Sequence, residues 1–366
     1  MARHVIKLGS GIVASADGAL RADVLAAICR EVATRRAVGD EVVIVTSGAI
    51  ARGIEIMGLS ARPTAIEDLQ AASAVGQGRL YRVYDELLSA EGVQSAQVLL
   101  TFFDLSDRTN YLNARQTLRR LLDWGVVPVI NENDTTATDE ITFGDNDFLA
   151  AQVAILVEAD ELVLLTGVDG VMTADPGSDP SATVIAEVSD FEALAAAANV
   201  TSTTSSLGSG GMRSKVVAAE MATAAGIPVV ICNGLRAEAV RTVLAGEKGE
   251  GTSFPARDLG YSSFKLWLRY AKAAHGTVTV DAGAARAIRD GGTSLLPVGI
   301  ASVDGDFRAG DAVDVLSADG EPLGKGIVNY DAADLATIAG MQSAEARTVL
   351  PWGAEEAVHR DYFVRV

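Results

Sequence analysis

The sequence predicts an α/β protein: a large domain with a mostly parallel sheet between helices, followed by a small, mostly-β domain. In the N-terminal part, short runs rich in Val, Ile and Leu alternate with alanine-rich stretches of helical length. The composition is 49% hydrophobic but only 5% aromatic, which suits helices packed on buried parallel strands. The alternation stops near residues 246–258, where Gly, Glu, Lys, Ser and Pro accumulate.

These changes along the chain predict its domain organisation. We expect the α/β domain at residues 1–256, a linker at 257–275, the mostly-β domain at 276–355 and a C-terminal tail at 356–366. In the second domain we expect strands over residues 277–283, 294–300, 311–317 and 324–330, and brief helices over 284–290 and 332–339.

Composition and charge exclude several classes of function. The net charge of −18 argues against binding of nucleic acid or anionic membranes by the whole surface. No apolar run reaches the roughly eighteen residues of a membrane span, and no signal peptide is recognisable. Cys29 and Cys232 are too few for a disulfide framework, so we expect a cytoplasmic protein. The three histidines have no metal-ligand spacing, so no protein metal site is predicted.

The first predicted strand, residues 5–8, contains Lys7 and runs into a glycine turn. The spacing of Gly9, Gly11 and Ala14 matches a dinucleotide-binding fingerprint, which keeps an oxidoreductase open as an alternative. The convincing helical pattern begins only near residue 22, however, and the second strand ends in Thr46 instead of an acid. A lysine at the end of a buried strand is costly unless it meets an anion. Lys7 therefore favours an anion site.

The second predicted strand, residues 41–45, runs into Ser47 and Gly48 at a strand-to-helix junction that could present a hydroxyl and backbone N–H groups to an anion. A long helix is predicted over residues 66–90, a strand over 93–100 and a helix over 109–124. The last helix has a basic face, which we expect to be solvated or to contact a subunit; it comprises Arg115, Arg119 and Arg120.

Residues 131–147 form a long polar stretch between a predicted strand over 125–130 and a predicted helix over 148–159. In an open α/β sheet, ligands bind beyond the carboxyl ends of the strands. The stretch is rich in carboxylates and amides, among them Asp134, Asn146 and Asp147. It suits a ligand with an ammonium group, a metal, or lysines that need a counter-charge.

A glycine-rich turn precedes the predicted helix over residues 216–225. Three glycines before a helix N-terminus, with Lys215 beside it, form a phosphate cradle in physical terms. It is not a Walker A loop, because glycine does not precede Lys215 and valine follows it. A strand over residues 161–166 ends in Thr166 and Gly167, and the last strand of the domain is predicted over 227–231.

Two lysines near strand ends, glycine-rich turns and an acidic centre together indicate phosphoryl transfer, which needs mainly positioning and charge neutralisation from the protein. An alcohol acceptor would require a catalytic base. A carboxylate acceptor would not, because a glutamate-like side chain with a pKa of about 4.3 is already ionised at neutral pH. The scarcity of histidine is compatible with a carboxylate acceptor.

These motifs, in this order, resemble the amino-acid kinase family, and within it the glutamate 5-kinases. The C-terminal part, including the segment 294–300, resembles a PUA domain. The resemblance covers nearly the whole chain and implies a three-layer α/β/α sandwich that phosphorylates the γ-carboxylate of L-glutamate with ATP and Mg²⁺, in the first step of proline synthesis. It further implies inhibition by proline, and we expect a homo-oligomer, a dimer or a tetramer. The matching segments are residues 7–10, 45–50, 131–134, 144–147 and 208–215.

The resemblance also implies roles for single residues. Lys7 and Lys215 would neutralise the phosphates, with Asp147 orienting them. Glutamate would be held by Ser47, Gly48, Asp134 and Asn146. The nucleotide would contact Lys7, Thr166, Gly167, Ser209, Gly210, Gly211, Met212, Arg213, Ser214 and Lys215. Three residues depart from the family pattern, which usually has aspartate at 167, threonine at 209 and a small residue at 213.

Other functions remain open from the sequence. A related kinase acting on acetylglutamate or aspartate fits the same class, although the 131–134 motif and the PUA-like part favour glutamate. An RNA-binding or RNA-modifying protein is an alternative from another class, because PUA domains often bind RNA. Residues 276–355 contain five basic and twelve acidic side chains, so we expect this domain not to bind nucleic acid by itself.

Overall fold

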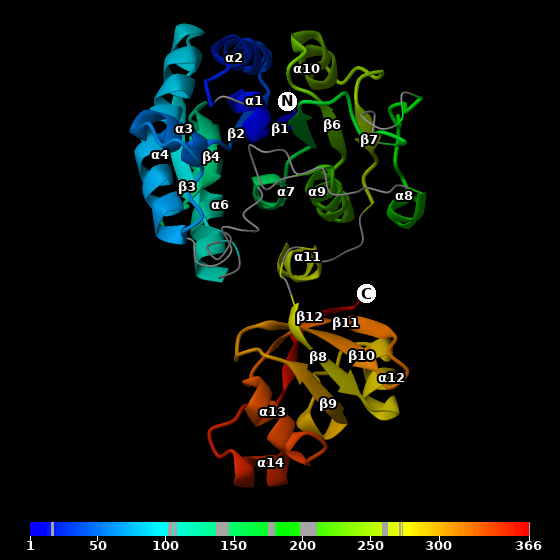
Figure 1. The fold of residues 1–366 in the computed structure, drawn as a ribbon. Helices are drawn as coiled ribbons and strands as arrows, with labels where there is room; N and C mark the ends of the chain where they lie inside the picture. The colour runs from blue at the N-terminus through cyan, green and yellow to red at the C-terminus, as the bar shows by residue number, and fades with distance from the viewer. Residues whose placement is uncertain are drawn as a thin grey trace. The chain divides into compact units, whose positions relative to one another are not determined.

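The computed structural model describes residues 1–15, 18–101, 105, 108–136, 146–174, 179, 181–197, 211–257, 263–270, 272 and 274–365. The chain divides into two compact units, Met1–Gly260 and Tyr261–Val366. Figure 1 shows the elements of each unit. Of the predicted site residues, Ser209 and Gly210 lie outside the described residues.

The first unit is built on a sheet with the strand order β3-β4-β2-β1-β5-β6-β7. All neighbouring strands pair in parallel except β7, which is antiparallel to β6. The central strands are almost completely buried, as expected for a parallel sheet covered on both faces. The strands are β1 (Arg3–Leu8), β2 (Glu41–Val45), β3 (Ser95–Leu100), β4 (Val127–Glu132), β5 (Glu161–Thr166), β6 (Val229–Asn233) and β7 (Thr252–Phe254).

Helices cover both faces of this sheet. In one layer α2 contacts α4 and α10, and in the other α7 contacts α6 and α9 (Figure 1). The predicted three-layer α/β/α sandwich is therefore confirmed. The helices are α1 (Ser10–Val13), α2 (Ala22–Ala37), α3 (Ala49–Met57), α4 (Ile66–Ala90), α6 (Arg108–Asp123), α7 (Asn146–Val157), α8 (Phe191–Ala197), α9 (Met212–Ala224) and α10 (Ala237–Leu244).

Several elements differ from the prediction. The short helix α1 begins directly after Gly9, and α7 and α9 begin earlier than predicted, at Asn146 and Met212. A polar first turn lacks the apolar periodicity used for prediction, yet an acidic residue such as Asp147 is favourable there because of the helix dipole. Strand β7 lies where the sequence indicated only a boundary, and helices α8 and α10 were not predicted.

The basic face of α6 is paired within the chain. Arg115 and Arg119 both bind the carboxylate of Glu158, the residue that follows α7. Glu158 has a φ of 55°, a left-handed backbone conformation that residues other than glycine rarely adopt. The two ion pairs stabilise this turn, so the basic face has a structural role in the isolated chain.

Helices α3 and α4 approach unusually closely at two glycines. A Cβ atom on Gly53 would lie 1.8 Å from the carbonyl oxygen of Ala72, and one on Gly76 would lie 1.9 Å from that of Ala49. These distances are far below van der Waals contact, so only glycine allows this packing. The close approach brings the middle of α4 towards the carboxyl ends of the strands, where α3 begins.

The second unit contains a separate five-stranded sheet with the order β12-β11-β10-β8-β9, in which β8 and β10 are parallel and the other pairs antiparallel. This sheet is the centre of the unit, as predicted for a mostly-β domain. The elements of the unit are α11 (Ser263–Tyr270), β8 (Ala274–Val280), α12 (Ala282–Asp290), β9 (Ile300–Gly305), β10 (Ala312–Ser317), β11 (Pro322–Val328), α13 (Ala332–Ile338), α14 (Ser343–Val349) and β12 (Val358–Arg365).

Three segments of this unit differ from what the sequence suggested. The strand predicted over residues 294–300 is wrong, because Pro297–Gly299 form a 3-10 turn and only Ile300 enters a strand. Helix α11 lies within the expected linker, and β12, within the expected tail, pairs with β11. The sequence of β12, VHRDYFVR, is too polar to indicate a strand by alternation alone.

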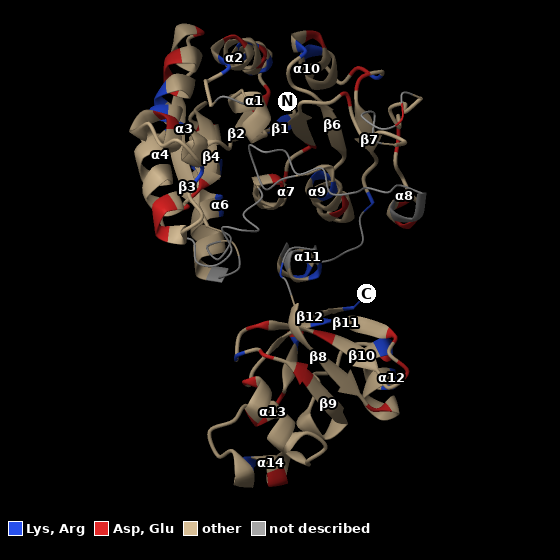
Figure 2. Ribbon diagram, in the orientation of Figure 1, with Lys and Arg blue, Asp and Glu red and all other residues tan. Residues whose placement is uncertain are grey.

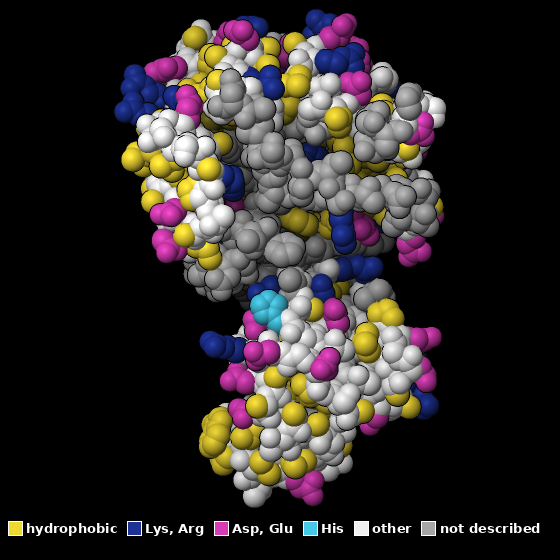
Figure 3. Space-filling model, viewed as in Figure 1, with side chains coloured by type: hydrophobic (Ala, Val, Ile, Leu, Met, Phe, Trp, Pro, Cys, Tyr) yellow, Lys and Arg dark blue, Asp and Glu magenta, His cyan; other side chains and the backbone are white. Residues whose placement is uncertain are grey.

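Charged and apolar side chains are distributed differently on the second unit. Within residues 276–355 the basic residues are spread over several elements, with Arg286 and Arg289 on α12, Lys325 on β11 and Arg347 on α14 (Figure 2). Hydrophobic side chains gather at the end that α14 occupies (Figure 3), where the side chain of Trp352 is 78% exposed.

In the described part of the chain, no helix combines the length and apolarity that a bilayer crossing needs.

Candidate active site

The carboxyl ends of β1 and β5 lie at the centre of the larger sheet. Strand β1 has β2 on one side and β5 on the other, so the connections from the neighbouring strands leave in opposite directions. Such a topological switch point opens a crevice beyond the strand ends and is the usual binding site of open α/β sheets. Lys7 is the penultimate residue of β1.

Two lysines bind one carboxylate at this point. The Nζ atom of Lys7 lies 2.5 Å from Oδ1 of Asp147, and Nζ of Lys215 lies 3.1 Å from Oδ2. Asp147 is completely buried, and the two lysines are 3% and 6% exposed. The structure thus brings together the three predicted catalytic residues, which come from β1, α7 and α9. Two cations around one anion leave a net positive charge, which suits an anionic ligand.

Ser214 contributes to the same group. Its hydroxyl lies 2.9 Å from Oδ2 of Asp147 and 2.8 Å from the carbonyl oxygen of Gly211. The sequence assigned Ser214 to the nucleotide, whereas the structure places its hydroxyl on Asp147. Gly211 is the N-cap residue of α9, with extended backbone, and Lys215 lies in the first turn of this helix. The positive end of the helix dipole therefore faces the same centre as the lysines.

An amide network joins the ends of β2, β4 and α7. The Asn146 side-chain amide donates to Oγ of Ser47 at 3.0 Å and to Oδ1 of Asn131 at 3.1 Å. The Asn131 amide in turn donates to Oε1 of Gln77 on α4 at 2.6 Å. Among the described residues, Oδ1 of Asn146 is buried and has no hydrogen-bond partner. A buried acceptor in this position could accept a hydrogen bond from a donor such as an ammonium group.

Gly48 follows Ser47 and is the N-cap residue of α3. Its φ of 102° lies in the left-handed region, and an added Cβ would contact the Val13 side chain at 3.2 Å. Glycine is therefore required for the turn that ends β2 and directs the Ser47 hydroxyl towards Asn146. The left-handed backbone conformation is by itself a sufficient reason for glycine at position 48, with or without a contact between this backbone and a ligand.

Asp134 lies just beyond β4 and is held by α4. The hydroxyl of Ser73 donates to its Oδ2 atom at 2.6 Å. Burial raises the pKa of the Asp134 carboxyl, while the Ser73 hydrogen bond and the charge of Arg62 act in the opposite direction. An ionised carboxylate at this position could bind an ammonium group.

Comparison with known proteins identifies the fold and the family. Residues 2–233 match the profile of the amino acid kinase family, and residues 276–350 match the PUA domain. The chain belongs to the amino acid kinase family. Membership makes the protein a kinase, an enzyme class that uses ATP as phosphoryl donor. The second unit contains the PUA domain that the sequence predicted.

Relatives in the amino acid kinase family match along the entire chain. A glutamate 5-kinase of Burkholderia vietnamiensis is 44% identical over 369 residues, which cover 100% of this chain and 98% of the relative. A glutamate 5-kinase of Synechococcus sp. is 45% identical over 359 residues, which cover 98% and 96% of the two chains. The crystal structure of UMP kinase from Bacillus anthracis, 21% identical with a TM-score of 0.50, covers 69% of this chain and 96% of that chain and supports the fold alone.

The described residues of the predicted nucleotide set lie at the ends of β1 and β5 and at the start of α9. Thr166 ends β5 beside β1, and Gly167 follows it on the surface. Of the residues on α9, Met212 is half-buried and Arg213 is exposed. Among the described residues, a Cβ on Gly167 would meet only a methyl group of Leu235, at 4.0 Å. The described surroundings of residue 167 would therefore accommodate a side chain. Packing does not explain why glycine stands here, where the family usually has aspartate.

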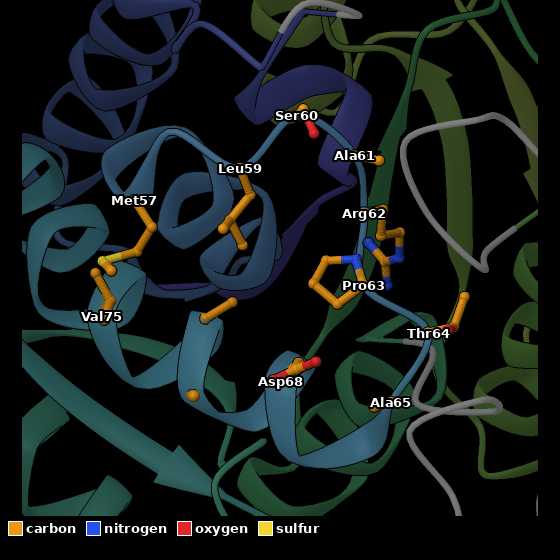
Figure 4. A pocket seen from close by; sticks show the side chains of 12 residues that line it. Met57, Leu59, Ser60, Ala61, Arg62, Pro63, Thr64, Ala65, Asp68 and Val75 are labelled. Carbon is orange, nitrogen blue, oxygen red and sulfur yellow. The ribbon is translucent and has the colours of Figure 1, made fainter.

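A surface pocket lies elsewhere in the kinase unit, at the segment between α3 and α4. In Figure 4, Met57 and Val75 lie on one side of it, and Arg62 and Thr64 on the other. None of the predicted site residues lines this pocket. The described residues predicted for catalysis and substrate binding lie instead near the strand ends, where the charged and amide side chains converge.

Two residues of α4, Ser73 and Gln77, were missed by sequence reasoning. They contact Asp134 and Asn131 and stand one helical turn apart within the apolar stretch AASAVGQ. Polar residues at this spacing on the buried face of a helix are a signal that could have identified them. Asn131 was part of a recognised motif but had no role assigned.

Proposed function

We propose that this kinase transfers the γ-phosphoryl group of ATP to the γ-carboxylate of L-glutamate and forms L-glutamyl 5-phosphate, the first step of proline biosynthesis. The observation that carries the proposal is the pair of buried lysines on one buried carboxylate, Lys7 and Lys215 on Asp147. The relatives that match the whole chain under the name glutamate 5-kinase support the choice of acceptor.

The lysine group suits transfer to a carboxylate. One oxygen of the ionised γ-carboxylate attacks the γ-phosphorus atom, the bond from phosphorus to the bridging oxygen breaks, and ADP leaves. No proton has to be removed, because a glutamate side chain with a pKa of about 4.3 is ionised at neutral pH. Lys7 and Lys215 neutralise charge on the phosphate oxygens, and Asp147 holds both ammonium groups in position.

The amino-acid end of glutamate would bind at the ends of β2, β4 and α7. Asp134 would accept from the α-ammonium group, and Oδ1 of Asn146, which no described residue binds, would accept a second hydrogen bond from it. Ser47 and the backbone of Gly48 would contact the remaining part of the substrate at the start of α3. The side-chain network then fixes glutamate with its γ-carboxylate towards the lysines.

The nucleotide would bind at the ends of β5 and α9. Thr166, Gly167 and the first turn of α9, from Gly211 through Met212, Arg213, Ser214 and Lys215, provide this side of the site, together with Ser209 and Gly210. Mg²⁺ would arrive as part of the substrate Mg·ATP, since kinase sites bind this ion largely through substrate phosphates. Both oxygens of Asp147 are engaged by lysines, which agrees with an ion held by the nucleotide.

We infer further properties from the same assignment. Proline keeps the amine and α-carboxylate of glutamate but lacks its γ-carboxylate, so it would occupy the amino-acid site and inhibit. We expect a homo-oligomer, a dimer or a tetramer, in the cytoplasm. The PUA domain would act as a structural or regulatory module, and phosphorylation of glutamate would be largely independent of it. The expected boundaries of the kinase domain, 1–256, and of the PUA-like domain, 276–355, are part of this proposal.

A coupled ADP-release assay tests the proposed function. Purified protein with Mg·ATP is offered L-glutamate, N-acetylglutamate and aspartate, and hydroxylamine is added to trap an acyl phosphate as a hydroxamate. We expect turnover with glutamate and hydroxamate formation in step with ADP release. Turnover confined to another acceptor, or ADP release without hydroxamate, would contradict transfer to the γ-carboxylate.

A further inference from the structure

Ser73 binds the carboxylate of Asp134 from the buried face of α4. Its side chain is 2% exposed, and its hydroxyl donates to Oδ2 of Asp134 at 2.6 Å. A hydrogen bond this short between a hydroxyl and a carboxylate is of the strong, charge-assisted kind. Asp134 lies in the turn after β4, where no regular backbone pairing fixes its side chain. Ser73 therefore supplies a fixed point for this side chain.

The hydrogen bond from Ser73 engages one carboxylate oxygen of Asp134, Oδ2, and leaves the other oxygen, Oδ1, available for a ligand. Among the described residues, no other hydrogen bond engages this carboxylate. Oδ1 is thus the acceptor that remains for an incoming donor, and its direction is set once Oδ2 is held. Fixing a carboxylate before the ligand arrives removes part of the entropy cost of binding.

The packing of α4 makes this contact possible. Gly53 and Gly76 let α3 and α4 come closer than any side chain at these positions would permit. Ser73 and Gln77, one turn apart, then face the strand ends together, and Gln77 binds Asn131 in the amide network. The same helix face thus holds both halves of the proposed amino-acid site.

We propose that Ser73 is a positioning residue for the amino-acid substrate: it holds the Asp134 carboxylate in the orientation that binds the α-ammonium group. The inference rests on the proposed role of Asp134. Ser73 acts on binding of the amino acid and takes no part in the transfer of the phosphoryl group, whose charged groups lie on β1, α7 and α9.

The pKa of the Asp134 carboxyl provides a second test of the role of Ser73, through the pH dependence of glutamate binding. Burial raises the pKa of its carboxyl, and the Ser73 hydrogen bond lowers it, as does the positive charge of Arg62 on the α3–α4 segment. Removal of the Ser73 hydroxyl leaves burial opposed by Arg62 alone among these causes. The pKa of Asp134 then rises, so the ionised, binding form is lost at a higher pH than in the wild type.

Steady-state kinetics of Ser73→Ala test the proposal. We expect the KM for glutamate to rise about tenfold, the scale of one hydrogen bond to a charged group, with kcat and the KM for ATP within about twofold of wild type. The acid limb of kcat/KM for glutamate should move to higher pH. Ser89→Ala, which removes an exposed serine from the same helix, is the matched control and should change none of these values.

A double-mutant cycle with Asp134→Asn separates the inference from the function on which it rests. If both are correct, Asp134→Asn raises the KM for glutamate and Ser73→Ala adds little in that background. A raised KM in Asp134→Asn with an unchanged KM and pH profile in Ser73→Ala overturns the role of Ser73 and leaves the proposed site intact. An unchanged KM in Asp134→Asn overturns the proposed binding role of Asp134, and the inference with it.

Discussion

The ammonium group of Lys7 lies 2.5 Å from a carboxylate oxygen of Asp147, a residue without solvent exposure. The second oxygen is bound by Lys215 from a distant part of the sequence. A buried anion with two cationic partners retains an excess positive charge that water does not screen. The phosphate oxygens of a bound nucleotide would meet this excess positive charge. The sheet thus contributes to phosphoryl transfer because its topology brings the two lysines and Asp147 together.

Loss of either lysine should abolish most of the catalytic rate. We expect Lys7→Ala and Lys215→Ala to lower kcat at least about a hundredfold, because each removes one preorganised charge contact to the phosphates. Initial-rate measurements with saturating glutamate and Mg·ATP provide the comparison. Lys248→Ala, at an exposed lysine of the same unit, is the control and should retain wild-type kcat. Lysine variants that keep most of the wild-type kcat would exclude the phosphate-binding role.

Proline should compete with glutamate through Asp134. A shared site predicts that proline raises the apparent KM for glutamate without lowering kcat, and that Asp134→Ala weakens both glutamate and proline binding while the KM for ATP stays near wild type. Initial rates measured at several proline and glutamate concentrations distinguish competitive from noncompetitive inhibition. Noncompetitive inhibition that persists in Asp134→Ala would indicate a separate proline site.

Both cysteines should be unreactive in the folded protein. Burial raises the pKa of the Cys29 thiol and of the Cys232 thiol to about 12, so almost no thiolate exists at pH 8. We expect no reaction with a thiol-specific disulfide reagent at pH 8, and release of two equivalents of chromophore after unfolding in denaturant. Rapid labelling of the native protein at either position would show that the thiol is accessible.

Two glycines of α4 should respond oppositely to alanine. At Gly76 the added Cβ would lie 1.9 Å from a backbone oxygen of α3, whereas at Gly78 it would meet no atom of the described residues within 4 Å. We expect Gly76→Ala to lower the free energy of unfolding by about 3 kcal/mol, the upper end for overpacking. Gly78→Ala should raise it by about 0.5–1 kcal/mol through helix propensity. Urea unfolding of both variants measures the difference, and equal stabilities would refute the close helix contact.

The full-length protein should not bind single-stranded RNA at physiological salt. The PUA region has five basic against twelve acidic residues, and its basic side chains are spread over several elements (Figure 2). Filter retention of labelled RNA at about 150 mM salt, repeated at low salt as a control for nonspecific attraction, is the measurement. Submicromolar binding at physiological salt would overturn the expectation.

Local patterns were sufficient for most of the larger unit. Runs of β-branched residues predicted strands β1, β2, β4, β5 and β6, because a parallel sheet buried on both faces requires such runs. Strands without a clear apolar pattern, such as the three-residue β7 and the polar β12, were missed, because their pairing partners supply the stability that their own sequences do not indicate.

The sequence by itself determined which chemistry is available: Lys7, Asp147 and Lys215 stand beside strand ends and a glycine-rich turn, and a parallel sheet collects such residues at one edge. Only the tertiary structure decided how these residues are supported. Ser73 and Gln77 reach the site because two helices meet at glycines, and Ser214 binds Asp147 because α9 begins earlier than its apolar pattern suggests. Contacts of this kind depend on distances between elements far apart in sequence, and local periodicity contains no information about those distances.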